Sequence, residues 1–194
     1  MNKNLINKMI AVGKNFYDRG WLFATSGNLS ARTDEGIILT ASGAHKGYLT
    51  EDDFVLIDLE GNVIEGKGKP SGETDFHLQL YNTFENVNSV IHTHSVYSSL
   101  VSLNEKVEFK DNEIMKAFDG IKEPAYPIEI PVFPNMQQKA ELLKLIAINS
   151  NKIKFGYLLK GHGLFAFASS LEKVQIYTET FEFLFKFEFL KSQK

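Results

Sequence analysis

The chain has 194 residues, of which 43% are hydrophobic and 23% are charged, and its formal net charge is -3. This composition is typical of one soluble globular domain over residues 1–194, and it provides no basic surface that would attract nucleic acid. The absence of cysteine excludes disulfides and thiolate metal ligands. No apolar run is long enough to cross a bilayer, so we expect a cytoplasmic protein that binds neither nucleic acid nor membranes.

Hydrophobic periodicity predicts helices along much of the chain. Leu5, Met9, Val12 and Phe16 share one helical face, and similar three- and four-residue spacing recurs further along. The segments predicted as helices are 4–19, 76–84, 96–103, 113–117 and 136–150.

The C-terminal segment combines two conflicting periods. Phenylalanines at every second position from Phe181 to Phe189 alternate as in a strand, but the Glu and Lys residues between them favour a helix. Ser169 with Glu172 also forms a capping-box signature. We predict a helix that is buried on more than one side, with an oligomer interface as its second partner.

Short runs of β-forming residues between these helices predict strands. The sequence DLEGNVIEG places Gly-Asn between two apolar runs and predicts a hairpin. The glycines around His162 separate two further short strands. The segments predicted as strands or strand pairs are 36–40, 54–58, 87–95, 128–133 and 155–168.

Two histidines, His92 and His94, lie one residue apart in the apolar segment VIHTHS. Residues two apart on a strand point to the same face, so both imidazoles can reach one metal ion. A catalytic zinc takes three protein ligands and keeps one position open, and His162, between two glycines, is the best third ligand. A lone histidine is more often structural, but the pair together with His162 favours a metal site.

Three short loops rich in Ser, Gly and Asn form a second candidate site: TSGN at 25–28, ASG at 41–43 and PSG at 70–72. Glycine lets backbone N–H groups approach an anion and serine adds hydroxyl donors, so converging loops of this kind can bind a phosphate. Each loop taken alone is better explained as an ordinary turn. Lys46 and Lys69, beside two of the loops, would add positive charge.

Two glutamates are candidates for acid–base chemistry. Glu73 stands at a predicted helix start, and apolar residues follow Glu113. A carboxylate in a half-apolar pocket near a metal suits general acid–base catalysis, although a capping or surface role is commoner for glutamate. We expect His77, on the helix after Glu73, to be structural or to support the site, and His45 to lie in a polar loop.

Five segments occur in the order typical of one known family: TSGNLSAR, LTASGAHKG, KPSGET, VIHTHS and LLKGHGL. Over nearly its whole length the sequence resembles the class II aldolase/adducin family. The resemblance implies an α/β fold of three layers, α/β/α, with a central and mainly antiparallel β-sheet. It also implies a homotetramer with active sites near the subunit boundaries.

The resemblance further implies roles for individual residues. His92, His94 and His162 match the ligands of one Zn2+ per subunit, and Glu113 matches the acid–base residue of the dehydratases. Glu73 matches a glutamate that transfers protons in the aldolases and can approach the metal. The residues that match the substrate phosphate site are Gly27, Asn28, Ser42, Gly43, Ser71, Gly72 and Lys46.

Within the family, the segments TASGAHKG, NEIMKAFDG and IPVFPNMQ resemble the methylthioribulose-1-phosphate dehydratases of methionine salvage. The implied reaction removes a proton from carbon three of this phosphorylated ketose and the hydroxyl from carbon four, which yields a diketone phosphate and water. One alternative is a fuculose- or ribulose-type sugar-phosphate aldolase or epimerase with the same metal and phosphate contacts. Another is a non-catalytic adducin-like interaction module, against which the three retained histidines count.

Overall fold

A computed structural model describes residues 1–193, and it contains ten strands and five α-helices over that range. The strands are β1 (Asn28–Thr33), β2 (Gly36–Thr40), β3 (Phe54–Ile57), β4 (Val63–Glu65), β5 (Ser89–Thr93), β6 (Val107–Phe109), β7 (Ile128–Ile130), β8 (Val132–Phe133), β9 (Gly156–Leu159) and β10 (Gly163–Ala168). The α-helices are α1 (Lys3–Asp18), α2 (Thr74–Thr83), α3 (Val96–Val101), α4 (Lys139–Ile148) and α5 (Leu171–Lys191).

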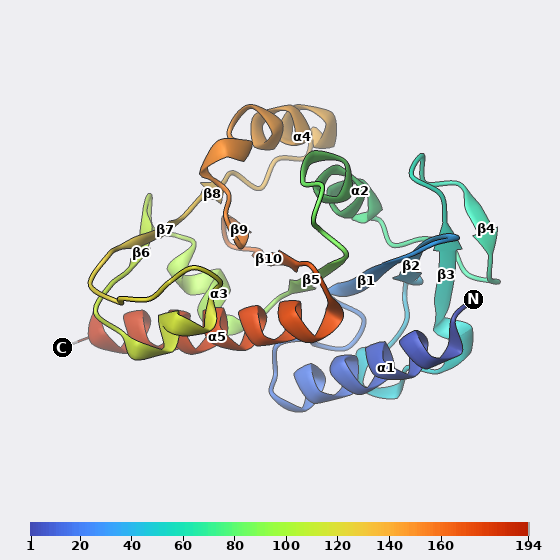
Figure 1. The fold of residues 1–194 in the computed structure, drawn as a ribbon, viewed down its shortest axis with the longest axis horizontal. Coiled ribbons are helices and arrows are strands. Elements are labelled where there is room, and N and C mark those ends of the chain that lie inside the picture. Colours follow the sequence, from blue (N-terminus) through green and yellow to red (C-terminus); the bar gives the residue numbers. More distant parts are fainter. Residues whose placement is uncertain (194) are drawn as a thin grey trace.

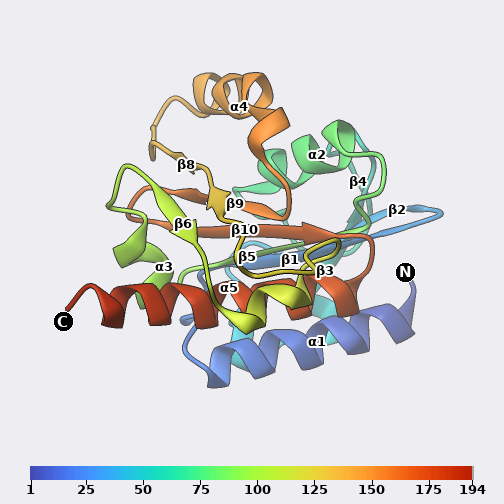
Figure 2. The ribbon, with the colours of Figure 1, turned by 60° about the vertical axis from the view of Figure 1, so that its left-hand side comes forward.

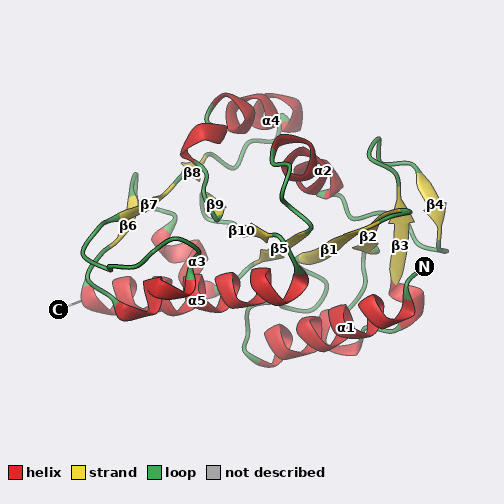
Figure 3. Cartoon of the chain, in the orientation of Figure 1, coloured by secondary structure: helices red, strands yellow, loops and turns green. Residues whose placement is uncertain are grey.

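The sheet forms the middle of three layers (Figures 1 and 2). Its strand order is β4-β3-β2-β1-β5-β10-β9-β8, and every neighbouring pair except β8–β9 is antiparallel. Helices α1 and α5 cover one face of the sheet, and α2 and α4 cover the other (Figure 3 shows the same layers by element type). The predicted α/β fold with a central, mainly antiparallel sheet is confirmed.

Each face of the sheet has its own hydrophobic core. One core joins the predicted apolar stripe of α1, including Met9 and Phe16, to the buried side of α5. The other joins α2 and α4 to residues such as Tyr157 and Phe165. Because helices cover both faces, the middle strands β1, β5 and β10 are largely buried, and the polar side chains they carry need specific partners.

The chain between residues 113 and 150 differs in detail from prediction. Residues Glu113–Ala117 form a 3-10 helix, and α4 begins at Lys139 instead of residue 136. The predicted strand IEIPVF, residues 128–133, is divided at Pro131, because proline has no N–H to continue a ladder. β7 pairs with β6 in a separate two-stranded sheet, whereas β8 joins the edge of the main sheet.

The C-terminal segment is the predicted helix, but its cap lies one residue later than the signature suggested. Ser170, not Ser169, has the extended backbone of an N-cap, and its side chain accepts a hydrogen bond from the Lys173 N–H. Phe181 and Phe185 are fully buried, while Phe183 and Phe187 are exposed. None of the helices described over residues 1–193 is both long enough and apolar enough to cross a membrane.

Candidate metal and phosphate site

The three candidate histidines meet where two paired strands turn. His92 lies in β5, His94 follows one residue after the end of that strand, and His162 lies in the turn from β9 to β10. β10 pairs with β5 in antiparallel register, with Leu164 opposite Thr93, so the turn returns beside the end of β5. Gly163 permits this approach, because a Cβ there would collide with the carbonyl oxygen of Thr93.

All three imidazoles direct Nε2 into one common space. His94 Nε2 and His162 Nε2 are 3.2 Å apart, and His92 Nε2 lies 3.4 Å from His162 Nε2. Glu73, immediately before α2, completes the group, with Oε2 3.3 Å from His92 Nε2 and Oε1 3.2 Å from His162 Nε2. The four ligand atoms lie within 4.8 Å of one another, so these side chains form a group that could hold a metal ion.

The spacing and chemistry of this group fit a small divalent metal. Zinc bonds of about 2.1 Å in tetrahedral geometry place neighbouring ligand atoms about 3.4 Å apart. The separations of 3.2 to 3.4 Å between these nitrogen and oxygen atoms match that edge. In addition, the Leu164 carbonyl accepts a hydrogen bond of 2.8 Å from His92 Nδ1, which leaves the lone pair of Nε2 free for a metal.

Protonation of the group follows from burial and mutual proximity. Burial lowers the pKa of His94 to about 3, and the adjacent His92 and His162 contribute to that lowering by repulsion. Burial opposes ionisation of Glu73, but His92 and His162 outweigh it and hold the pKa of the carboxyl well below its ordinary value. The result is a neutral imidazole at His94 and an ionised carboxylate at Glu73, which are the forms that bind metals.

A buried chain of hydrogen bonds, which ends at Tyr81, holds the Glu73 carboxylate in place. Asn28 Nδ2 donates to Glu73 Oε2 at 2.7 Å, and Asn28 Oδ1 is paired with His77 Nε2. His77 Nδ1 lies 2.6 Å from Ser30 Oγ, which lies 2.7 Å from Tyr81 Oη. Burial lowers the pKa of His77 to about 3, so this ring is neutral. Its one proton is then on Nε2, because Asn28 Oδ1 can only accept.

The three Ser/Gly loops are brought together beside this chain. The Ser42 N–H donates to the Lys69 carbonyl at 2.8 Å, and Asn28 Nδ2 also donates to Ser71 Oγ at 3.2 Å. A Cβ added at Gly43 or at Gly72 would meet nothing within 4 Å, so both glycines face open space. Gly27 and Gly43 both have a positive φ, of +71° and +79°, but Gly27 also lies against the His92 carbonyl, which leaves no room for a side chain.

Two predicted site residues, Lys46 and Glu113, lie outside the group of four possible metal ligands. Lys46 is fully buried, and its Nζ donates to the carbonyls of Thr25 and Ala44 at 3.1 and 2.7 Å. Glu113 is on the surface, where its carboxylate is paired with Lys116 at 2.6 Å, and it is not part of the group of four ligands.

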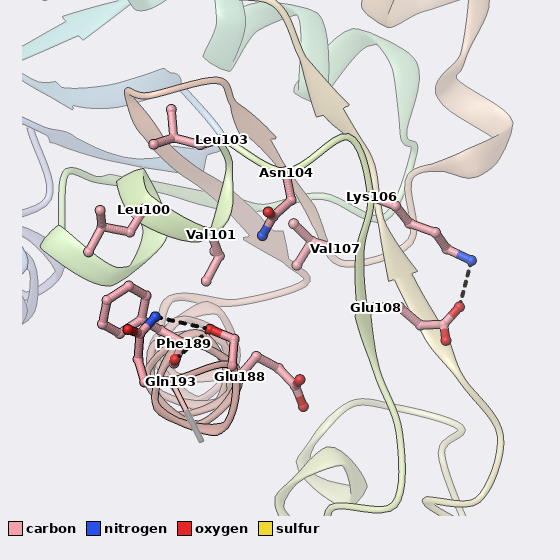
Figure 4. A pocket seen from close by; sticks show the side chains of 11 residues that line it. Leu100, Val101, Leu103, Asn104, Lys106, Val107, Glu108, Glu188, Phe189 and Gln193 are labelled. Carbon is pink, nitrogen blue, oxygen red and sulfur yellow. Dashed lines mark hydrogen bonds and ion pairs between the residues drawn. The ribbon is translucent and has the colours of Figure 1, made fainter.

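A surface pocket of about 400 Å³ lies elsewhere, between α3, β6 and the end of α5 (Figure 4). Its wall combines Leu100, Val101 and Phe189 with the ion pair of Lys106 and Glu108. None of the three histidines, Glu73 or the Ser/Gly loops belongs to the lining described for it. The pocket therefore contributes no group to the candidate metal site.

Comparison with known proteins agrees with this geometry. The profile of the Class II Aldolase and Adducin N-terminal domain matches residues 7–189. This chain belongs to the class II aldolase and adducin family. It is 40% identical over 190 residues to a methylthioribulose-1-phosphate dehydratase of Azotobacter vinelandii, covering 95% of this chain and 92% of that protein. A methylthioribulose-1-phosphate dehydratase of Pseudomonas paraeruginosa is also 40% identical, over 97% of this chain and 96% of its own length.

Solved structures of the family share the fold. An L-fuculose 1-phosphate aldolase superposes with a TM-score of 0.84 at 25% identity, covering 100% of this chain and 88% of that one. The L-fuculose-1-phosphate aldolase of Thermus thermophilus gives a TM-score of 0.79 at 24% identity, over 99% of this chain and 96% of that chain. The match to the family profile and the 40% identical relatives confirm the predicted family membership.

Proposed function

We propose that this protein is a metal-dependent hydro-lyase that converts 5-methylthioribulose 1-phosphate to 2,3-diketo-5-methylthiopentyl 1-phosphate and water, a step of methionine salvage. The observation that carries the proposal is the convergence of three imidazoles and one carboxylate in a chain that aligns with dehydratases over almost its whole length. The relatives carry that enzyme name, and the donor group has the composition of a catalytic metal site. We also propose that residues 1–194 form one domain that acts in the cytoplasm.

His92, His94 and His162 would hold one Zn2+ per subunit, because the set of three imidazoles suits zinc and leaves room for substrate. When bound, such a metal acts as a Lewis acid that polarises the substrate carbonyl. Elemental analysis of the purified protein should find about one zinc per chain, and His94→Ala should abolish that content. Stoichiometric metal retained by His94→Ala would contradict the assignment.

Glu73 and Glu113 would divide the proton transfers. Among the residues described, Glu73 is the carboxylate that lies with the histidines, and it is held ionised, so it is placed to take the proton from carbon three. Glu113 in its protonated form would deliver a proton to the hydroxyl leaving carbon four. Gly27, Asn28, Ser42, Gly43, Ser71 and Gly72 would orient the substrate by its phosphate.

Glu113 can act in this way only if it reaches a metal site. Its surface position and its absence from the ligand group support a role at the site of a neighbouring copy in a homotetramer. The exposed apolar face of α5, defined by Ile176, Phe183, Phe187 and Leu190, supports contact between copies. A contact between copies would bury this face, so that α5 would be buried on two sides, as predicted.

The experiment that decides between dehydratase and aldolase supplies both substrates to the purified protein. We expect a diketone phosphate from methylthioribulose 1-phosphate and no cleavage of fuculose 1-phosphate. Formation of an aldehyde and dihydroxyacetone phosphate from fuculose 1-phosphate, without any diketone from the first substrate, would refute the proposal. Absence of bound metal together with unchanged folding would instead favour an adducin-like module.

A further inference from the structure

Lys46 is the one lysine described in the structure whose side chain is fully buried. It is the first residue of a 3-10 helix, Lys46–Tyr48, and only 1% of its surface is exposed. Burial lowers the pKa of its ammonium to about 8, and the nearby carboxylates of Asp53 and Glu73 partly oppose that effect. A buried ammonium is costly, so its retention calls for specific partners.

The partners of Lys46 belong to two different loops of the candidate phosphate site. Nζ donates to the Thr25 carbonyl in the TSGN loop and to the Ala44 carbonyl directly after the ASG loop. The main-chain N–H of Lys46 adds a third contact, to the Ala24 carbonyl at 2.9 Å. Ala24 has a φ of +48°, a conformation that non-glycine residues seldom adopt and that surrounding contacts must maintain.

The hydrogen bonds to Lys46 fix the orientation of peptide groups in the two loops. In a peptide group the carbonyl and the following N–H point opposite ways, so the Thr25 and Ala44 carbonyls that turn toward Lys46 direct the N–H groups of Ser26 and His45 away from it. The Ser26 N–H donates to the Phe23 carbonyl at 2.7 Å, which leaves the neighbouring glycines as the candidate donors. Gly43 already borders open space, and within residues 1–193 neither its N–H nor that of Gly27 donates to another loop or turn carbonyl. Both N–H groups would therefore be available to an anion held between the loops.

We propose that Lys46 is a positioning residue that fixes the TSGN and ASG loops at the spacing required by the substrate's phosphate, and that it does so through the two carbonyls without touching the phosphate itself. The inference rests on the proposed phosphate site and differs from direct binding by Lys46, which the sequence resemblance implies. Direct binding requires the charge of the ammonium, whereas positioning requires only hydrogen-bond donors at Nζ.

The lack of native cysteine allows these two roles to be separated chemically. In Lys46→Cys the single thiol can be alkylated in denaturant before refolding. Bromoethylamine restores a charged donor at the position of Nζ, and iodoacetamide places a neutral amide nitrogen there. Ethyl iodide gives an apolar side chain with no donor. Lys67→Cys, treated in the same way, is the control, because Lys67 is an exposed lysine of the loop that leads to PSG.

The readouts are the affinity for inorganic phosphate by calorimetry, KM and kcat for methylthioribulose 1-phosphate, zinc content and circular dichroism. We expect the ethyl adduct to lose about tenfold or more in phosphate affinity and to raise KM similarly, as two hydrogen bonds are lost. Zinc content should be unchanged and kcat should fall less than KM rises. Both the aminoethyl and the amide adducts should restore phosphate affinity to within about threefold of the wild type.

Rescue by the aminoethyl group alone would overturn the proposal and support direct contact with the phosphate. Unchanged phosphate affinity in the ethyl adduct would overturn any role for Lys46. If the adducts do not refold, Lys46→Gln and Lys46→Met, expressed directly, make the same comparison between an amide donor and an apolar side chain. A wild type that dehydrates the substrate but is not affected by phosphate would refute the inference, whereas a wild type without dehydratase activity would refute the proposed function.

Discussion

The side-chain amide of Asn28 donates a hydrogen bond of 2.7 Å to Glu73 Oε2, which joins the start of β1 to the carboxylate of the candidate metal site. An amide can bind in two orientations, and the reversed one would direct Oδ1 at a carboxylate. The Glu73 carboxylate requires the Nδ2 donor, and His77 reinforces this orientation, because its Nε2–H donates to Asn28 Oδ1. The histidine therefore sets the position of Glu73 without contacting it.

This relationship predicts that His77→Phe weakens zinc binding about 10- to 100-fold, because Glu73, whose charge lies among the three histidines, loses the group that orients it. His77→Gln should bind zinc more tightly than His77→Phe, since the amide nitrogen of glutamine can replace the Nε2–H donor. Competition with a chromogenic chelator measures both constants. Tyr81→Phe, at the far end of the same chain, is the control and should change the constant by less than about threefold. Equal losses in the Phe and Gln variants of His77 would show that orientation of Asn28 is not what matters.

A second buried carboxyl, Glu182 on α5, predicts how stability depends on pH. Thr93 Oγ1 donates to Glu182 Oε1 at 2.8 Å, and burial raises the pKa of this carboxyl from 4.5 to about 7. Between these two pH values the folded protein retains a proton that the unfolded chain has released. Stability contributed by this group therefore falls as pH rises from about 4.5 to about 7, by a total of about 3 kcal/mol.

Glu182→Gln should remove this contribution to the pH dependence. Urea denaturation at pH 5 and at pH 8 should show the variant gaining stability relative to the wild type as pH rises, by about 1 to 3 kcal/mol. The difference between the two proteins isolates Glu182, because every other titratable group is common to both. A constant difference between the two pH values would mean that Glu182 is ionised throughout that range.

Much of the fold follows from local pattern, and the errors have identifiable physical causes. Helix α1 and the hairpin of β3 and β4 were predictable because periodicity and turn chemistry act over a few residues. Residues 128–133 were predicted as one strand, but Pro131 interrupts it, and the pairing of β7 and β8 in different sheets depends on segments distant in the chain. The C-terminal helix was predictable against the alternating phenylalanines because helix formers lie between them.

The candidate site was predictable in composition but not in its supporting contacts. The pattern H-x-H and the Gly-His-Gly segment suggested His92, His94 and His162, and the structure brings these side chains together with Glu73. Nothing local in the sequence indicated that Ser30 and Tyr81 extend the chain behind Glu73, since they lie on β1 and α2 and meet only across the fold. The burial of Lys46 could not be predicted from the sequence either, because a lysine beside a glycine-rich loop is usually solvated.

The proposed association of copies through the apolar face of α5 can be tested at two phenylalanines. Phe183 and Phe187 are 50% and 42% exposed, although both are large and apolar. Replacing both with lysine should dissociate the assembly, because it places two charges in an interface that excludes water. Light scattering after gel filtration measures the mass. Ile148→Lys on α4, where the native side chain is 80% exposed, is the control and should leave the mass unchanged. A doubly substituted protein of unchanged mass would exclude this face from the interface.

The final prediction tests whether Glu113 acts on the metal site of a neighbouring subunit. Glu113→Gln and His94→Ala should each be inactive alone, the first with its metal retained and the second without it. If each site combines His94 of one subunit with Glu113 of the next, a randomly mixed assembly contains intact sites at about one quarter of positions. Co-expression with two affinity tags and assay of the doubly purified protein should therefore recover about a quarter of wild-type turnover. If both residues acted within the same subunit, no intact site could form, and turnover would stay at the level of the separate variants.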